Sequence, residues 1–241
     1  MINVIQHRFE KNVLLPFDLQ PAKLIFADPP YNLGVKYADD PTGDAQPDAD
    51  YFDWCKDVIS STSALLAPGG TFWWLCPESH GDIVGPMLTS IVGNRVGRIV
   101  WHETFAQYQQ KSLTKDYRFL FCHTNGDVKN VTFFPDAIRE PSVRQQIGDK
   151  RADPRGRVPG SVWKIRRLQG TSTDRVDWHP CQLPPEMLQR IILGWTNIGD
   201  HCIDLFAGSG NFGKVCKREN RKATLIDGSP TYVSKLKDMF K

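Results

Sequence analysis

The sequence lacks any long apolar run, any internal repeat and any recognisable export signal. Its longest strongly apolar stretch, Thr71–Cys76, has 6 residues, whereas a helix that spans a bilayer needs roughly 20. The opening segment, MINVIQHRFEKN, contains no long apolar core and no small-residue cleavage site, so we expect no secretory signal. These absences argue against the membrane, secreted and collagen-like classes and predict a cytoplasmic protein.

Paired cysteines and metal-ligand spacings are also missing. The 6 cysteines are widely scattered without a C-x-x-C pair, and the 6 histidines show no ligand spacing. We therefore expect reduced thiols and no metal site. Neither G-x-S-x-G nor G-x-x-x-x-G-K-[ST] occurs, which gives no support for a serine hydrolase or a P-loop nucleotidase.

What is present is an ordinary globular composition, with 241 residues of which 40% are hydrophobic and 24% charged. This length favours one large domain, or one domain with an insert. Apolar runs predict strands at 23–27, 71–76, 95–101, 117–123, 201–206 and 223–227, and helices at 51–66, 80–92, 185–195 and 212–219, with a last short helix reaching 241. Pro68-Gly-Gly70 is expected to close the helix that precedes it. Strands alternating with helices predict an α/β fold with a largely parallel sheet.

Charge is distributed unevenly along the chain. From Arg139 to Arg175 there are 10 basic residues against 4 acids, whereas 7 Asp and 1 Lys lie between Asp39 and Asp57. Such runs are often solvated faces. A basic block in a chain that is elsewhere mildly acidic is also what binding to a phosphate backbone requires. Both interpretations stay open at this point.

A glycine-rich turn follows the predicted strand at 201–206. Gly208, Gly210 and Gly213 match G-x-G-x-x-G, a spacing that lets the backbone approach a nucleotide at a helix N-terminus. A purely structural turn is the alternative, but Asp227 ends the next strand, where an acid can bind ribose hydroxyls. Only 14 residues follow Asp227, too few for another crossover and strand. The order of elements therefore predicts a permuted nucleotide-binding fold and disfavours a dinucleotide oxidoreductase.

The segment Asp28-Pro-Pro-Tyr31 ends another apolar strand. It could be a simple strand-ending turn with an Asp cap. It would also hold a carboxylate, a carbonyl and an aromatic face in one rigid loop. That set suits an exocyclic amine on a planar base: Asp28 and the Pro29 carbonyl would accept the amino hydrogens, and Tyr31 would stack on the ring.

Four motifs in order make the chain resemble the DNA amino-methyltransferases of the permuted β class. They are Asp28–Tyr31, the basic stretch 139–178, His179-Pro-Cys-Gln-Leu-Pro184, and Phe206-Ala-Gly-Ser-Gly210. The resemblance implies a doubly wound, mostly parallel sheet of the Rossmann-like methyltransferase type, circularly permuted, with a small basic, loop-rich recognition insert. It divides the chain into a catalytic half at 1–135, a target-recognition region at 136–178 and a cofactor-binding half at 179–241.

The implied activity is methyl transfer from S-adenosylmethionine to the exocyclic amine of a flipped base, with adenine N6 favoured over cytosine N4 by the Asp of Asp28–Tyr31. Catalytic residues would be Asp28, Pro29, Pro30 and Tyr31. The cofactor site would comprise Asp204, Phe206, Gly208, Gly210, Asp227, His179 and Gln182. DNA would contact Arg144, Arg151, Arg155, Arg157, Lys164, Arg166 and Arg167.

The chain departs from the family pattern in two places. Cys181 and Leu183 stand where the family usually has Thr and Lys, and no Gly-Asp pair occurs among residues 4–8. The expected partners are double-stranded DNA, a cognate restriction endonuclease and a second copy in a homodimer. The alternatives are a methyltransferase of cytosine N4, of RNA or of protein glutamine, and a catalytically inactive DNA-binding relative.

Overall fold

The computed structural model describes residues 1–10, 19–40, 44–103, 109–170 and 172–241. Its strands are β1 (Ile2–Gln6), β2 (Ala22–Ala27), β3 (Leu66–Pro77), β4 (Asn94–His102), β5 (Tyr117–Thr124), β6 (Val162–Lys164), β7 (His201–Asp204) and β8 (Lys222–Asp227). The α-helices are α1 (Asp48–Ser63), α2 (Gly81–Ile91), α3 (Val143–Gln146), α4 (Pro185–Trp195), α5 (Asn211–Arg218) and α6 (Pro230–Met239). Single 3-10 turns lie at Glu78–His80, Val128–Asn130 and Pro135–Ile138.

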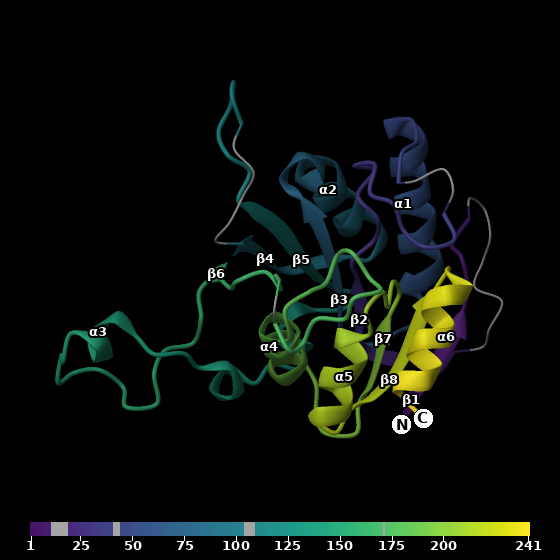
Figure 1. Ribbon diagram of the computed structural model, residues 1–241. Helices are drawn as coiled ribbons and strands as arrows, with labels where there is room; N and C mark the ends of the chain where they lie inside the picture. Colours follow the sequence, from purple (N-terminus) through teal and green to yellow (C-terminus); the bar gives the residue numbers. More distant parts are fainter. Residues whose placement is uncertain (11–18, 41–43, 104–108, 171) are drawn as a thin grey trace.

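All of these strands belong to one sheet, ordered β1-β8-β7-β2-β3-β5-β4-β6 (Figure 1). The neighbours from β1 to β3 are parallel, and β5 runs antiparallel to both β3 and β4. The strands β2 and β7 are adjacent although about 180 residues separate them in the chain. The segments that follow them therefore meet at one edge of the sheet, as predicted for a permuted, mostly parallel α/β fold.

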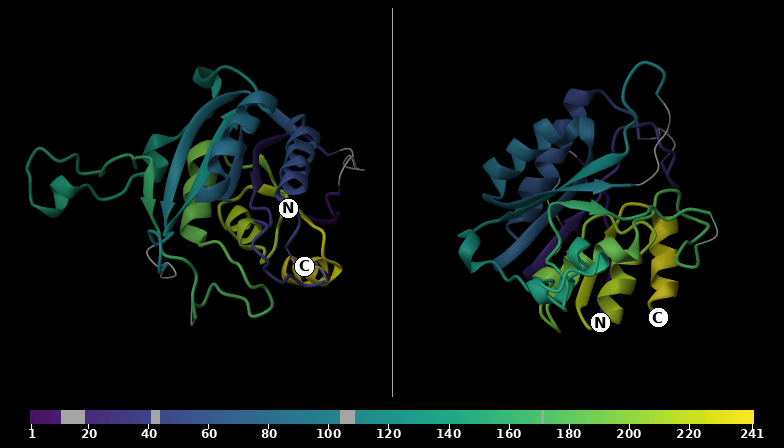
Figure 2. Two further views of the ribbon diagram at one scale, coloured as in Figure 1. Left: turned by 90° about the horizontal axis from the view of Figure 1, so that it is seen from above. Right: turned by 90° about the vertical axis from the view of Figure 1, so that its left-hand side faces the viewer.

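Helices cover both faces of the sheet, which lies between them in Figure 2. Side chains alternate along the strands: in β2, Leu24 and Phe26 pack toward α4 and α5, whereas Ile25 and Ala27 pack toward α1 and α2. This alternation explains why residues 24–27 of β2 and 72–76 of β3 are apolar without interruption, since both faces of these segments are buried.

Most predicted elements are confirmed, and α4 begins and ends at the predicted residues. Its proline at Pro185 occupies the first helical position, where the missing N–H costs nothing. The expectation for Pro68-Gly-Gly70 is wrong, because α1 already ends at Ser63 and these residues lie inside β3. Gly69 has a φ of +68° and the pairing of β2 with β3 shifts register there. An irregular strand start thus resembles a helix terminator in sequence.

Two short strands were not predicted. β1 pairs in parallel with β8 at one sheet edge, and β6 pairs with β4 at the other. Between β5 and β6 the chain forms an arm, residues 139–160, that carries α3 and projects from the body in two views (Figures 1 and 2). At the base of the arm, Glu140 and Arg157 form an antiparallel bridge. No helix within the described ranges is long and apolar enough to cross a membrane.

Candidate active site

The loops after β2, β7 and β8 meet around a cavity of about 780 Å³. Nearly all of the predicted catalytic and cofactor residues line it: Asp28, Pro29, Pro30, Tyr31, His179, Gln182, Asp204, Phe206, Gly208 and Asp227. Gly210 stands apart from the lining. It caps α5 with a φ of +79°, and a Cβ there would lie 2.6 Å from Leu236. The structure therefore brings together two motifs that lie about 180 residues apart in the sequence.

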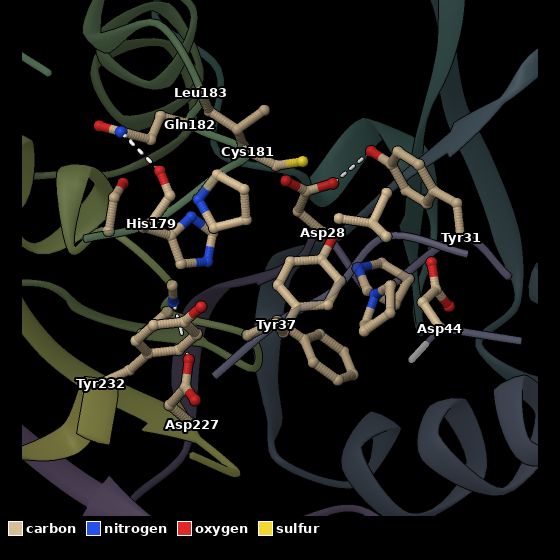
Figure 3. A pocket seen from close by; sticks show the side chains of 18 of the residues that line it. Asp28, Tyr31, Tyr37, Asp44, His179, Cys181, Gln182, Leu183, Asp227 and Tyr232 are labelled. Atoms are coloured by element: carbon tan, nitrogen blue, oxygen red, sulfur yellow. Dashed lines mark hydrogen bonds between the residues drawn. The ribbon is translucent and has the colours of Figure 1, made fainter. Parts of the chain in front are cut away.

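Asp28 lies half-buried at the end of β2, with its carboxyl group facing the cavity (Figure 3). The Tyr31 hydroxyl donates a hydrogen bond to Asp28 Oδ1. Burial raises the pKa of Asp28 to about 6, although the Tyr31 hydrogen bond and the charge of Arg118 act in the opposite direction. At neutral pH Asp28 is a carboxylate, and its second oxygen accepts no hydrogen bond from the residues that the structure describes. Pro30 is fixed in turn, because its carbonyl accepts a hydrogen bond of 2.9 Å from Tyr51.

The glycine-rich turn is tied to Asp227 by backbone hydrogen bonds. Gly208 N–H donates to Asp227 Oδ2 at 2.9 Å, and Ser229 N–H donates to Oδ1 at 2.8 Å. Gly208 has a φ of +47°, and a Cβ there would lie 2.8 Å from the His179 ring. Only glycine fits this position without strain. Asp227 therefore shapes the turn and still presents free lone pairs to the cavity.

Asp204, at the end of β7, is a second buried acid that lines the cavity, 3% exposed. Burial raises its pKa well above the usual range, and a hydrogen bond from Phe206 N–H at 3.2 Å partly offsets this effect. The Phe206 ring packs on Phe9 and Trp54, with centroids 5.3 and 5.7 Å apart. An acidic floor beside aromatic surfaces favours a ligand that carries positive charge and a planar ring.

His179 packs against the glycine-rich turn and the start of α6. Its ring lies edge-on to Tyr232, with centroids 4.8 Å apart, and 5.8 Å from the ring of Tyr37. Burial lowers its pKa to about 4, so the imidazole is neutral at pH 7. His179 thus forms an uncharged wall of the cavity rather than a cationic contact.

Gln182 holds the loop around His179. Its side-chain amide donates to the carbonyls of Val176 and His179 at 2.6 and 2.9 Å, and its oxygen accepts from Val176 N–H at 2.9 Å. Cys181, one of the departures from the family pattern, points toward Asp28 in Figure 3. At the other departure, His7 and Arg8 line the cavity just after β1.

Some residues of the site carried no sequence signal. Asp44 lies in the acidic segment, yet its carboxylate is buried and accepts hydrogen bonds from Asn32 and Leu33 N–H at 2.6 and 3.2 Å. Asp39 accepts hydrogen bonds from Ser229 Oγ and Thr231 N–H at 2.6 and 3.0 Å. Asp44 thus holds the backbone just after Tyr31, and Asp39 fastens a later part of the same segment to the start of α6. Regularly placed Asp residues in a polar stretch look like solvated charge in sequence.

Glu103 and Arg118 were also missed. Arg118 Nε donates to Glu103 Oε1, and the Arg118 guanidinium lies 4.8 Å from the centre of the Tyr31 ring. Glu103 ends up beside the cavity because β4 and β5 are neighbours. A recognisable motif surrounds neither residue, so only the three-dimensional structure reveals them.

The basic stretch is divided between two places. Arg167 and Arg175 line the cavity, and Lys164 and Arg166 are exposed at and just after β6. The remaining cations predicted to bind DNA, Arg144, Arg151, Arg155 and Arg157, lie on the arm and form ion pairs with its acids. Trp163, which follows the arm in the chain, is part of the hydrophobic core and 3% exposed.

Within the described part of the chain, no group of 3 or more His, Cys, Asp or Glu side chains could hold a metal ion. The cavity is lined by carboxylates, aromatic rings and backbone groups.

Known proteins resemble this chain in sequence over most of its length. A model of the family N6_N4_Mtase, described as DNA methylase, matches residues 22–238. The type II methyltransferase M.BglII of Bacillus subtilis is 27% identical over 237 residues, which cover 91% of this chain and 64% of the relative. The DNA adenine methyltransferase YhdJ of Escherichia coli (strain K12) is 30% identical over 219 residues, which cover 87% of this chain and 73% of the relative.

Solved structures share the fold at lower identity. The cytosine-N4-specific PvuII DNA methyltransferase aligns with a TM-score of 0.64 and 14% identity, covering 92% of this chain and 81% of that one. A complex of M1.HpyAVI with S-adenosylmethionine aligns with a TM-score of 0.61 and 18% identity, covering 99% and 100%. The match over residues 22–238 assigns this chain to the N6/N4 family of DNA methylases, a family that depends on S-adenosylmethionine.

Proposed function

We propose that the protein is a DNA methyltransferase that methylates the exocyclic amine of a flipped base, adenine N6, at Asp28. The observation that carries this proposal is the placement of Asp28 and Asp227 in one cavity. Asp28 would accept hydrogen bonds from the amine, and Asp227 would accept them from the cofactor. The same cavity holds the Tyr31 ring, on which a planar base would stack.

The chemistry proposed for Asp28 follows from its surroundings. An exocyclic amine is a poor nucleophile because its lone pair is delocalised into the ring. The free oxygen of Asp28 and the Pro29 carbonyl would accept the amino hydrogens and draw them out of the ring plane, which localises the lone pair on nitrogen. With a pKa of about 6, Asp28 is charged at neutral pH and can take up the proton that the methylated nitrogen releases.

The residues on the other side of the cavity fit S-adenosylmethionine. This cofactor supplies an electrophilic methyl group on a sulfonium. Asp227 would bind the ribose hydroxyls, and buried Asp204 would face the positively charged methionine end. Phe206 and the backbone of Gly208 would border it, while His179 would form a neutral wall. Gln182 and Gly210 would act by shaping the loops that carry these groups.

Double-stranded DNA is the proposed substrate. Asp28 and Tyr31 lie inside the cavity, and a base paired within a duplex cannot reach them unless it is flipped out. The exposed cations of region 136–178 would contact the phosphate backbone. A cognate restriction endonuclease as partner stays a prediction. A homodimer also stays a prediction, which light scattering on the purified protein would test.

The test is methylation of unmodified plasmid DNA by the purified protein, with S-adenosylmethionine as the methyl donor. Digestion to nucleosides followed by mass spectrometry should yield N6-methyladenine from the wild type and none from Asp28→Ala. Detection of N4-methylcytosine alone would refute adenine as the target and leave the amine chemistry standing. Methylation of RNA in preference to DNA would refute the proposed substrate, and absence of any methylated base would refute the activity.

A further inference from the structure

Arg118 lies directly behind Tyr31. Its guanidinium carbon is 4.8 Å from the centre of the Tyr31 ring and 6.0 Å from that of Trp101. The side chain is 25% exposed and borders the cavity. One face of Tyr31 is therefore covered by a cation, and only the opposite face remains for a base.

Glu103 fixes Arg118 in this position. The Glu103 side chain is 6% exposed and accepts a hydrogen bond from Arg118 Nε. Its other oxygen lies 3.4 Å from Arg167 Nη1, and its own N–H donates to the Asp116 carbonyl at 2.8 Å. Two guanidinium groups and a backbone hydrogen bond therefore hold Glu103 in place outside the cavity. Glu103 thus keeps the guanidinium behind Tyr31.

We infer that Arg118 and Glu103 are positioning residues for the methyl-transfer step, in which Arg118 holds the Tyr31 ring and keeps Asp28 charged, and Glu103 holds Arg118. The inference rests on the proposed role of Asp28 as the carboxylate that binds the amine. It adds a second set of residues, on β5 and just after β4, to those found in the motifs.

The electrostatic part of the inference depends on which groups around Asp28 carry charge. Arg118 lowers the pKa of Asp28, and Glu103 raises it. Among the described residues, the other groups that face Asp28 are Tyr31 on its own loop, Cys76 near the end of β3, Tyr37 and Cys181 on the surrounding loops, and Asp204 at the end of β7.

Burial raises the pKa of both thiols and both phenols, so these groups stay uncharged near neutral pH. Burial also raises the pKa of Asp204. Arg118 is the one cation among these neighbours. Its removal should therefore raise the pKa of Asp28, because the effect of burial is then opposed only by the Tyr31 hydrogen bond.

The experiment measures single-turnover methyl transfer as a function of pH at saturating cofactor and DNA. For the wild type we expect the rate to fall below about pH 6, as Asp28 becomes protonated. Arg118→Met should move this acidic limb upward by about one pH unit, and Arg118→Lys, which keeps the charge, should restore it. Arg98→Met is the matched control, because Arg98 also lies over an aromatic ring, 5.3 Å from the centre of Phe119, but does not border the cavity.

Glu103→Gln provides an independent test with the opposite sign. Gln retains an acceptor for Arg118 and removes the negative charge, so the acidic limb should move to lower pH. Thermal melting and cofactor affinity identify variants that have not folded. If Arg118→Met fails to fold, the shift of the acidic limb in Glu103→Gln alone tests the inference.

Each outcome has a distinct meaning. An acidic limb that stays at the wild-type pH in folded Arg118→Met overturns this inference, as does an unchanged or raised limb in Glu103→Gln. The proposed function is tested separately by Asp28→Asn: wild-type rates in that variant would refute the role of Asp28 itself. Inactive Asp28→Asn together with unshifted limbs would refute the positioning role alone.

Discussion

At the scale of single residues, Asp28 is subject to opposing influences. Burial favours the protonated form, whereas the Tyr31 hydroxyl and the Arg118 charge favour the carboxylate. The balance places the pKa near 6, close enough to neutral pH for the group to be charged before the reaction and to accept a proton during it. A fully solvated Asp would be too weak a base for the second task.

Asp28→Ala should abolish methyl transfer while DNA and cofactor binding survive, because the missing carboxylate acts on the reacting amine. Single-turnover rates, with binding followed by fluorescence anisotropy, would show this. Asp127→Ala is the matched control: Asp127 also accepts a hydrogen bond from a backbone N–H, that of Lys129, but does not border the cavity. Retention of a tenth of the wild-type rate in Asp28→Ala would contradict the role proposed for Asp28.

Asp227→Ala should weaken S-adenosylmethionine binding by about 1.5–3 kcal/mol, the range for hydrogen bonds to a charged group. Part of this effect would come through Gly208, whose N–H bonds to Asp227. Calorimetry measures the affinity. Asp200→Ala serves as the control. Asp200 also accepts a hydrogen bond from a backbone N–H, that of Asn197 at 2.7 Å, but it lies just before the start of β7 and does not border the cavity. Unchanged affinity in Asp227→Ala would contradict the proposed contact between Asp227 and the ribose.

The predictable part of the site consists of residues within short motifs. Asp28 and Gly208 follow apolar strands and are recognisable from their neighbours in sequence. Arg118, Glu103 and Asp44 are not, because each acts through partners that the fold brings from distant segments. Asp44 even lies in an acidic run that looks solvated, although its carboxylate is buried.

At the scale of elements, the sequence predicts buried parallel strands well and edge strands poorly. Residues 24–27 of β2 are apolar on both faces, which is an unambiguous pattern. β6 has only 3 residues, with an exposed, buried, exposed pattern, and is defined by its pairing with β4. Such a segment has too few apolar positions to be recognised before its partner strand is known.

The arm leads into β6, and it carries several of the cations that are proposed to contact DNA. Arg151, Arg155 and Arg157 are exposed, and each is paired with an acid of the same region. Exposed pairs of this kind are weak, so the cations can turn to phosphates when DNA approaches.

Replacing Arg151, Arg155 and Arg157 together by Gln should weaken DNA binding and flatten its dependence on salt by about 0.9 for each phosphate that is no longer neutralised. Titration of DNA at several salt concentrations gives the slope. Replacement of Lys217, Arg218 and Lys222, three exposed cations on α5 and at the start of β8, is the charge-matched control. Equal salt dependence of DNA binding in the two triple variants would contradict a role of the arm in DNA binding and favour the interpretation that its charges form a solvated face.

At the scale of the whole molecule, the fold unites segments that are distant in the chain. The cavity has walls from the loop after β2 and from the loops after β7 and β8, and Asp39 links the first of these to the start of α6. A ligand that filled the cavity would contact all three of these loops. Binding to this folded state and not to the unfolded chain must stabilise the molecule.

S-adenosylmethionine at about 100 times its dissociation constant should stabilise the fold by about 2.7 kcal/mol, which corresponds to a rise in Tm of about 5–10 °C for a domain of this size. Differential scanning calorimetry measures the rise. Because Asp227 is proposed to bind the ribose, Asp227→Ala should show a smaller rise at the same cofactor concentration. NAD, tested at equal concentration, carries the ribose but lacks the cationic methionine end that would face Asp204. A rise with NAD as large as that with S-adenosylmethionine would therefore contradict the cofactor assignment and favour a dinucleotide site.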